Sequence, residues 1–192
     1  PHKWLFTNFD CSAFFMRDPQ RLVNALTLTP AYLESSLGGN TPEYRDWSVA
    51  LGRRFRALKL WFVMRSYGAE GLRALLRNHI AWTERLSGLI TGDDRFELVA
   101  GPNLAMLAFR LKGGAMHSDA QVDALNERLL ERLNGAGRIY LTRTRHRGRT
   151  VIRFVIGQTY TQWHHVEQGW DEIRKAAEEL MAQSLREAET PY

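Results

Sequence analysis

The sequence predicts an α/β chain in two parts, in which helices accompany a small sheet. Three observations support this fold class. Two long stretches in the first half carry apolar residues at helical spacing, and a further stretch with this spacing runs to the carboxyl end. Between them, NLAMLAFRLKG alternates apolar and other residues as a half-buried strand does. The pattern changes near Asp93, which divides the chain into residues 1–91 and residues 92–192.

The first part begins with an apolar, aromatic segment, LFTNFDCSAFFMRD, for which we expect a strand. A loop containing Gly and Pro, TPAYLESSLGGNTPEYRDW, separates it from two helical stretches. In RRFRALKLWFVMRSYG the apolar residues fill much of the circumference, which predicts a helix buried between layers; they are Phe55, Leu58, Trp61, Phe62 and Met64. The next stretch, EGLRALLRNHIAWTERLSGLI, is apolar on one side and predicts an amphipathic helix.

The second part reads in the order strand, helix, hairpin, helix. Ser118 and Gln121 have the spacing of a capping box, which predicts the start of a helix with an apolar face at Val122, Leu125, Leu129 and Leu133. In YLTRTRHRGRTVIRF we expect a β-hairpin that turns near Arg147 and Gly148. A long amphipathic helix then carries Val166, Trp170, Ile173, Ala177 and Leu180 on one face.

The composition bounds the function classes. The 192 residues carry a net charge of +5, which allows an acidic partner such as a nucleic acid. The basic residues that could form such a surface crowd into the hairpin: Arg143, Arg145, Arg147, Arg149 and Arg153. No aromatic residues interleave with them as in a base-stacking platform, so we expect a solvated, charge-protected hairpin and no nucleic-acid partner.

The sequence lacks a membrane-spanning stretch, a secretory signal and a second cysteine, and these features bear on cellular location and redox chemistry. No uninterrupted apolar stretch approaches the ~20 residues that cross a bilayer, and the start lacks the features of a secretory signal. We therefore expect a cytoplasmic protein without a membrane partner. Cys11 is the lone cysteine, so it cannot form an internal disulfide and supports no metal site. We expect it in the core.

Four stretches, in order and over essentially the whole chain, carry a resemblance to a known family: PHKW, AYLESS, YRDWSVALGRRFRALKLWFVMRSYG and VIRFVIG. They resemble the carboxy-terminal part of the aromatic-L-amino-acid decarboxylases, which are group II, pyridoxal-phosphate-dependent enzymes of the aspartate-aminotransferase-like fold (fold type I). The resemblance implies that residues 1–91 are the end of the large, cofactor-binding domain with its catalytic loop. Residues 92–192 are then the small α+β domain.

Lysine is the residue whose amine can form a Schiff base with the aldehyde of pyridoxal phosphate, and Lys3 stands at the head of an apolar, aromatic run. Burial there would keep more of the amine neutral and nucleophilic. The resemblance implies that Lys3 binds the cofactor in this way and that His2 donates to the cofactor phosphate. It also implies that the backbone at Gly52 reaches the phosphate bound in the partner subunit of a homodimer.

By the same resemblance, Tyr32 matches the catalytic-loop tyrosine that protonates the quinonoid carbon left when carbon dioxide departs. Relatives with phenylalanine at this position are oxygen-consuming aldehyde synthases. We therefore predict decarboxylation of an aromatic L-amino acid to the amine, with aldehyde synthesis as the alternative.

The remaining arginines have structural or open roles. We expect Arg53, Arg54 and Arg56 to pair with acids inside the fold or across the dimer. Arg153 lies on a strand resembling the one that carries the substrate-carboxylate arginine in aminotransferases, although a place in the charge-protected hairpin explains it as well.

Part of the family's cofactor pocket precedes the lysine, namely a histidine that stacks on the cofactor ring and an aspartate that pairs with the pyridine nitrogen. This chain begins with a proline two residues before that lysine. We expect either that the amino-terminal half of the enzyme is supplied as a second polypeptide, or that the chain alone is an inactive fragment.

Overall fold

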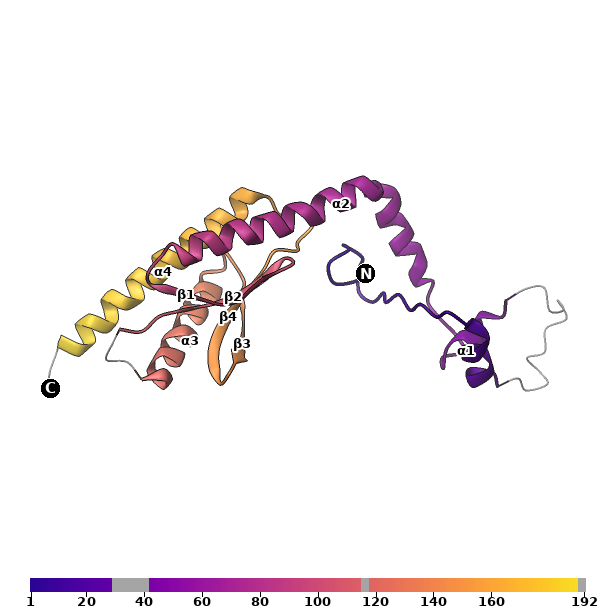
Figure 1. Cartoon of the computed structure of the whole chain (residues 1–192), viewed down its shortest axis with the longest axis horizontal. Coiled ribbons are helices and arrows are strands. Elements are labelled where there is room, and N and C mark those ends of the chain that lie inside the picture. The colour runs from indigo at the N-terminus through magenta and orange to yellow at the C-terminus, as the bar shows by residue number, and fades with distance from the viewer. Residues whose placement is uncertain (29–41, 115–117, 190–192) are drawn as a thin grey trace. The chain divides into compact units, whose positions relative to one another are not determined.

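The computed structural model describes residues 1–28, 42–114 and 118–189, with side chains as far as residue 184 (Figure 1). The chain forms two compact units, Pro1–Gly68 and Ala69–Tyr192. Their boundary lies inside α2 (Arg56–Thr91), where Gly68 has a φ of 66° and a ψ of 169° and interrupts the helix. The two predicted helical stretches are therefore the two halves of α2. The predicted domains, residues 1–91 and 92–192, have a later boundary and stay a prediction.

The first unit contains little regular structure outside α2. The predicted strand in LFTNFDCSAFFMRD is wrong, because this segment is irregular with isolated bends and pairs with no strand in the described residues. Two short helices follow, α1 (Pro19–Leu26) and the 3-10 helix η3 (Tyr44–Trp47). Asp18 caps α1 by accepting a hydrogen bond from the Gln20 backbone N–H at 3.2 Å, and Pro19 occupies the first helical position.

The apolar residues in the first half of α2 are not buried as predicted. The exposed side chains include Leu58, Trp61, Phe62 and Met64 in the helix and Phe55 just before it. The prediction is wrong for the described residues of this unit because they place no second layer over the helix. The spread of apolar residues around the helix circumference indicated burial, but it did not indicate which residues would cover the helix.

The second unit is built on a four-stranded antiparallel sheet in the order β1-β2-β4-β3. Its strands are β1 (Phe96–Asn103), β2 (Met106–Leu111), β3 (Thr142–His146) and β4 (Arg149–Val155). The strand predicted in NLAMLAFRLKG is confirmed as β2, but the expectation that only one of its faces is buried is wrong, since residues 107–111 are all buried. The predicted hairpin is β3 with β4. Arg147 and Gly148 both have positive φ angles, 50° and 81°, as the tight turn of a twisted hairpin requires.

Two helices complete this unit: α3 (Asp119–Ala136) and α4 (Trp163–Glu189). The capping box at the start of α3 is confirmed, since the Ser118 hydroxyl accepts from the Gln121 N–H and the Gln121 side chain accepts from the Ser118 N–H. The apolar faces predicted for both helices are buried.

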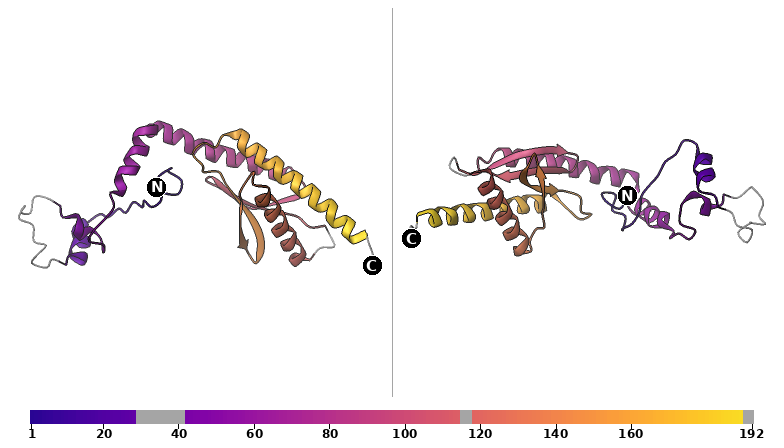
Figure 2. Two further views of the ribbon diagram at one scale, coloured as in Figure 1. Left: turned by 180° about the vertical axis from the view of Figure 1, so that it is seen from behind. Right: turned by 90° about the horizontal axis from the view of Figure 1, so that it is seen from below.

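The core of the second unit joins the sheet to α3, α4 and the second half of α2 (Figures 1 and 2). An aromatic group lies at its centre, where the ring centroid of Trp170 is 4.9 Å from that of Phe96 and 6.2 Å from that of Phe109. The core also includes Leu86 and Ile90. These contacts bury the one-sided apolar face predicted for the second half of α2.

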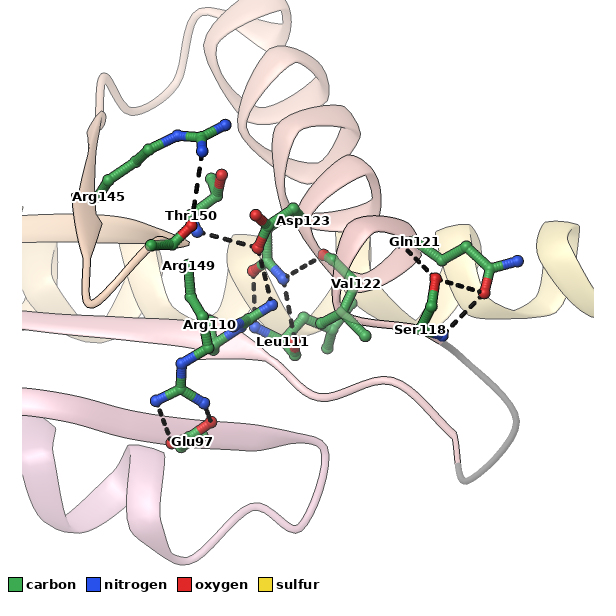
Figure 3. A network of polar contacts seen from close by, with 12 residues as sticks. Glu97, Arg110, Leu111, Ser118, Gln121, Val122, Asp123, Arg145, Arg149 and Thr150 are labelled. Carbon is green, nitrogen blue, oxygen red and sulfur yellow. Dashed lines mark hydrogen bonds and ion pairs between the residues drawn. The ribbon is translucent and has the colours of Figure 1, made fainter.

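A buried polar network fixes the start of α3 against the sheet (Figure 3). The Asn126 side chain accepts from the Leu111 N–H at 2.7 Å and donates to the Leu111 carbonyl at 2.9 Å. Asp123 pairs with the buried guanidinium of Arg110 at 3.0 Å and accepts from the Thr150 N–H at 2.9 Å. Helix α3 is therefore tied to both central strands by polar as well as apolar contacts.

His79, in the second half of α2, is fully buried, and this burial lowers its pKa below 6.5. Between that lowered pKa and about 6.5, the unfolded chain binds a proton that the folded chain does not, so stability falls as the pH falls. We expect His79→Leu to flatten this dependence, as measured by the urea midpoint at pH 7.5 and pH 5.5. If the urea midpoint of His79→Leu changes as much between pH 7.5 and pH 5.5 as that of the wild type, His79 is not the source of the pH dependence.

None of the described helices is both long enough and apolar enough to span a bilayer.

Candidate functional site

Lys3 lies in a tight turn at the beginning of the chain. The Leu5 N–H donates to the Pro1 carbonyl at 3.2 Å, which closes the turn around Lys3. The Lys3 side chain is exposed. The expected burial of its amine is therefore wrong for the described residues of this chain, because none of them covers it. The turn instead presents the primary amine outward, where it can react with an aldehyde.

His2 is fixed by the backbone of Cys11. Its Nδ1 lies 2.7 Å from the Cys11 carbonyl oxygen and 3.1 Å from the Cys11 nitrogen, and its backbone N–H donates to the same carbonyl at 3.2 Å. The ring also meets Phe9 edge to face, with 5.1 Å between centroids. Because Nδ1 faces Cys11, Nε2 is the ring nitrogen that can contact a ligand outside this segment.

The Cys11 segment is in turn attached to the start of α2. The Arg56 Nε lies 3.0 Å from both carboxylate oxygens of Asp10. Cys11, which is buried as predicted, places its Sγ 3.8 Å from the Arg56 carbonyl. The guanidinium lowers the pKa of the Asp10 carboxyl, and the charge of Lys59 adds to this effect. The predicted pairing of Arg56 with an acid is confirmed.

Gly52, a further predicted site residue of the first unit, has open surroundings. Gly52 is exposed, and a Cβ built on it would meet no atom within 4 Å, so the described residues give no steric reason for glycine here. Arg53 and Arg54 are exposed too. Tyr32 lies outside the described residues.

Lys3 and His2 fit pyridoxal phosphate by their chemistry. Lys3 offers an accessible primary amine for the aldehyde, and His2 offers a fixed imidazole whose Nε2 can meet a phosphate oxygen. A backbone without a side chain, as at Gly52, suits close approach to a phosphate. No set of three or more His, Cys, Asp or Glu side chains in the described residues could hold a metal ion.

Two of the five arginines of the basic hairpin pair with carboxylates. Arg143 pairs with Glu127, and the Arg149 guanidinium lies 3.3 Å from Glu97 (Figure 3). Arg153 places its Nη2 3.4 Å from the Met106 sulfur. These contacts favour the charge-protected interpretation of the hairpin.

The sequence did not identify Asp10 as part of the site. Its partner Arg56 is 46 residues away, and no local spacing signals such a pair. The one sequence signal was the arginine-rich LGRRFR, which predicted acidic partners without naming them.

Comparison with known proteins decides the family. The family described as "Pyridoxal-dependent decarboxylase conserved domain" matches residues 1–112, which include the Lys3 turn and all of α2. The chain belongs to this family. The predicted resemblance is thereby confirmed.

Similar proteins agree with this family match. The chain is 42% identical to the aromatic-L-amino-acid decarboxylase of Drosophila lebanonensis over 179 residues, covering 93% of this chain and 42% of the relative. The chain also matches the crystal structure of Oryza sativa TDC with PLP and tryptamine, with 40% sequence identity and a TM-score of 0.87. The match covers 94% of this chain and 38% of that one. The predicted fold class, that of fold type I enzymes, is confirmed by this agreement.

A third similarity is to an enzyme whose name denotes a different product. Rhodiola rosea 4-hydroxyphenylacetaldehyde synthase is 30% identical, with a TM-score of 0.71 over 84% of this chain and 32% of that one. The chain spans about two-fifths of the length of the relatives it matches.

Proposed function

We propose that this chain is part of a pyridoxal-phosphate-dependent decarboxylase that converts an aromatic L-amino acid to its amine. The observation that carries the proposal is the exposed Lys3 amine beside the fixed His2 ring, inside the segment that matches the decarboxylase family. The sequence similarity to an aromatic-L-amino-acid decarboxylase supports the substrate class.

Each residue has a distinct task in this proposal. Lys3 would hold the cofactor covalently until the substrate amine takes its place, and His2 Nε2 would donate to the phosphate. Bound pyridoxal phosphate would supply the electron sink for the pair left behind by carbon dioxide. Tyr32 would then deliver a proton from its hydroxyl to Cα of the substrate.

We also propose that the enzyme works as a cytoplasmic homodimer together with the amino-terminal half of the protein. In the dimer, the backbone at Gly52 would reach the phosphate held by the partner subunit. The open space around Gly52 supports this, because nothing in its own unit requires a glycine.

Aldehyde synthesis is the second candidate, and the similarity to the Rhodiola rosea synthase favours it. The hydroxyl of Tyr32 favours the amine, since the proposed proton donor is present. An inactive fragment is the third possibility, because the chain spans about two-fifths of its relatives.

We expect pyridoxal phosphate, followed by borohydride reduction, to label Lys3. The test is peptide mass mapping after reduction, with Lys3→Arg as the variant that should lose the label. Lys112→Arg is a matched control, since Lys112 is exposed in the second unit. Equal labelling of Lys3 and Lys112, or a label retained in Lys3→Arg elsewhere on the chain, would contradict the assignment.

A further inference from the structure

Resting on the proposed function, we propose that the ion pair between Asp10 and Arg56 is a positioning device that holds Lys3 and His2 in place for the cofactor. Neither residue would touch the reacting atoms. They would act through the backbone of Cys11, which contacts His2 on one side and follows Asp10 directly on the other.

The contacts form a continuous path from a rigid element to the lysine. Arg56 is the first residue of α2, and its Nε lies 3.0 Å from each carboxylate oxygen of Asp10. The neighbouring Cys11 meets Nδ1 of His2 through both its carbonyl oxygen and its nitrogen. His2 then precedes Lys3 inside the turn that the Leu5 N–H closes on Pro1.

Besides this path, the segment contacts α2 through the rings of Phe6 and Tyr67, whose centroids are 5.8 Å apart. Residues 1–18 contain no helix and no strand, so no ladder of backbone hydrogen bonds fixes them. A segment of this kind samples many backbone conformations unless specific contacts select one. The Asp10–Arg56 pair joins residues 46 positions apart and so restricts this freedom more than a local pair could.

The pair also persists under working conditions. Arg56 holds the pKa of the Asp10 carboxyl below its usual range, so the carboxylate stays charged at neutral pH. The Cys11 Sγ, 3.8 Å from the Arg56 carbonyl, lies against the same point of α2. Two adjacent residues, one charged and one buried, therefore attach the lysine segment to the helix.

A surface ion pair of similar exposure provides a matched control. The side chains of Arg56 and Asp10 are 34% and 39% exposed, and those of Arg149 and Glu97 are 35% and 37% exposed. Both pairs link residues far apart in sequence, but the second lies on the sheet. The variants are therefore Asp10→Asn, Glu97→Gln and the exchanged pair Asp10→Arg with Arg56→Asp, each in the full-length protein.

The first readout needs no cofactor. Cys11 is buried, so its rate of alkylation by iodoacetamide, followed by mass mapping of its peptide, reports how often the segment opens. Loss of this partly exposed ion pair is expected to raise this rate about three- to fivefold in Asp10→Asn. The exchanged pair should restore slow alkylation, and Glu97→Gln should match the wild type.

The second readout separates positioning from a merely structural role. In Asp10→Asn we expect the borohydride-trapped cofactor at Lys3 to need a higher pyridoxal phosphate concentration, by about the same factor as the alkylation rate changes. The turnover number should fall at saturating cofactor while the KM for the amino acid changes less, because Lys3 and not the substrate is displaced. The exchanged pair should recover both values.

Several results would overturn the proposal. One is cofactor uptake in Asp10→Asn within twofold of the wild type, even with Cys11 exposed, since the pair would then be structural only. Another is an equal effect of Glu97→Gln. Failure of the proposed function is distinguishable, because it would appear in the wild type itself as the absence of any cofactor at Lys3.

Discussion

Replacement of Tyr32 by phenylalanine is expected to reduce amine formation by about 10²–10⁴-fold, the usual contribution of a positioned proton donor. The substitution removes one hydroxyl and keeps the ring, so the size and shape of the side chain are nearly retained. If the proposed proton transfer to Cα is lost, oxygen can compete for the same carbon. The product should then shift toward the aldehyde, with release of hydrogen peroxide.

The measurement is parallel quantification of amine, aldehyde and peroxide with an aromatic L-amino acid. Tyr160→Phe is the matched control, because Tyr160 is an exposed tyrosine of the second unit and has no proposed role in catalysis. Its product ratio should equal that of the wild type. Amine formation by Tyr32→Phe within twofold of the wild type would reject Tyr32 as the proton donor and reopen the aldehyde alternative.

Replacement of Asp123 by alanine is expected to destabilise the second unit by about 3 kcal/mol or more, because it leaves a buried cation without its partner. The Arg110 side chain is only 2% exposed, and Asp123 is the carboxylate that it contacts, at 3.0 Å. The same change also removes the acceptor for the Thr150 N–H, so a second buried polar group loses its hydrogen bond.

Urea unfolding followed by circular dichroism measures this loss as a shift in midpoint. Asp123→Asn separates the two effects, since its side-chain oxygen can still accept from Thr150 while the charge is gone. Glu97→Gln should cost at most about 1 kcal/mol, as is usual for a partly exposed ion pair. If Asp123→Ala and Glu97→Gln shift the midpoint equally, the contacts of Asp123 with Arg110 and Thr150 contribute no more than the surface pair of Glu97 and Arg149 (Figure 3).

Local signals predicted the second unit well. Each of three correct predictions depends on residues that lie close together in the sequence. They are the Ser118 capping box, the turn at Arg147 and Gly148 and the apolar face of α4. Strand β1 was not predicted, and it contains Gly101 and Pro102, which are residue types typical of turns. Non-local pairing with β2 makes this stretch a strand.

The candidate site was predictable in its residues but not in its surroundings. The resemblance identified Lys3 and His2, yet neither the exposure of Lys3 nor the Asp10 contact to Arg56 follows from sequence spacing. The strand expected from LFTNFDCSAFFMRD failed for a related reason, because apolar composition cannot supply a pairing partner. Long-range contacts decide both cases.

The amide of Asn126 takes the place of a peptide group from a neighbouring strand. It accepts from the Leu111 N–H and donates to the Leu111 carbonyl, while Asp123 accepts from the Thr150 N–H on β4. Two side chains of one helix thus replace the next pair of the ladder between β2 and β4, whose strand pairing ends at Phe109 and Ile152. A sequence that replaced Asn126 with an aliphatic residue would have to extend the pairing by two residues or admit a water molecule. The length of the β2–β4 pairing in this fold therefore depends on which residue stands at position 126.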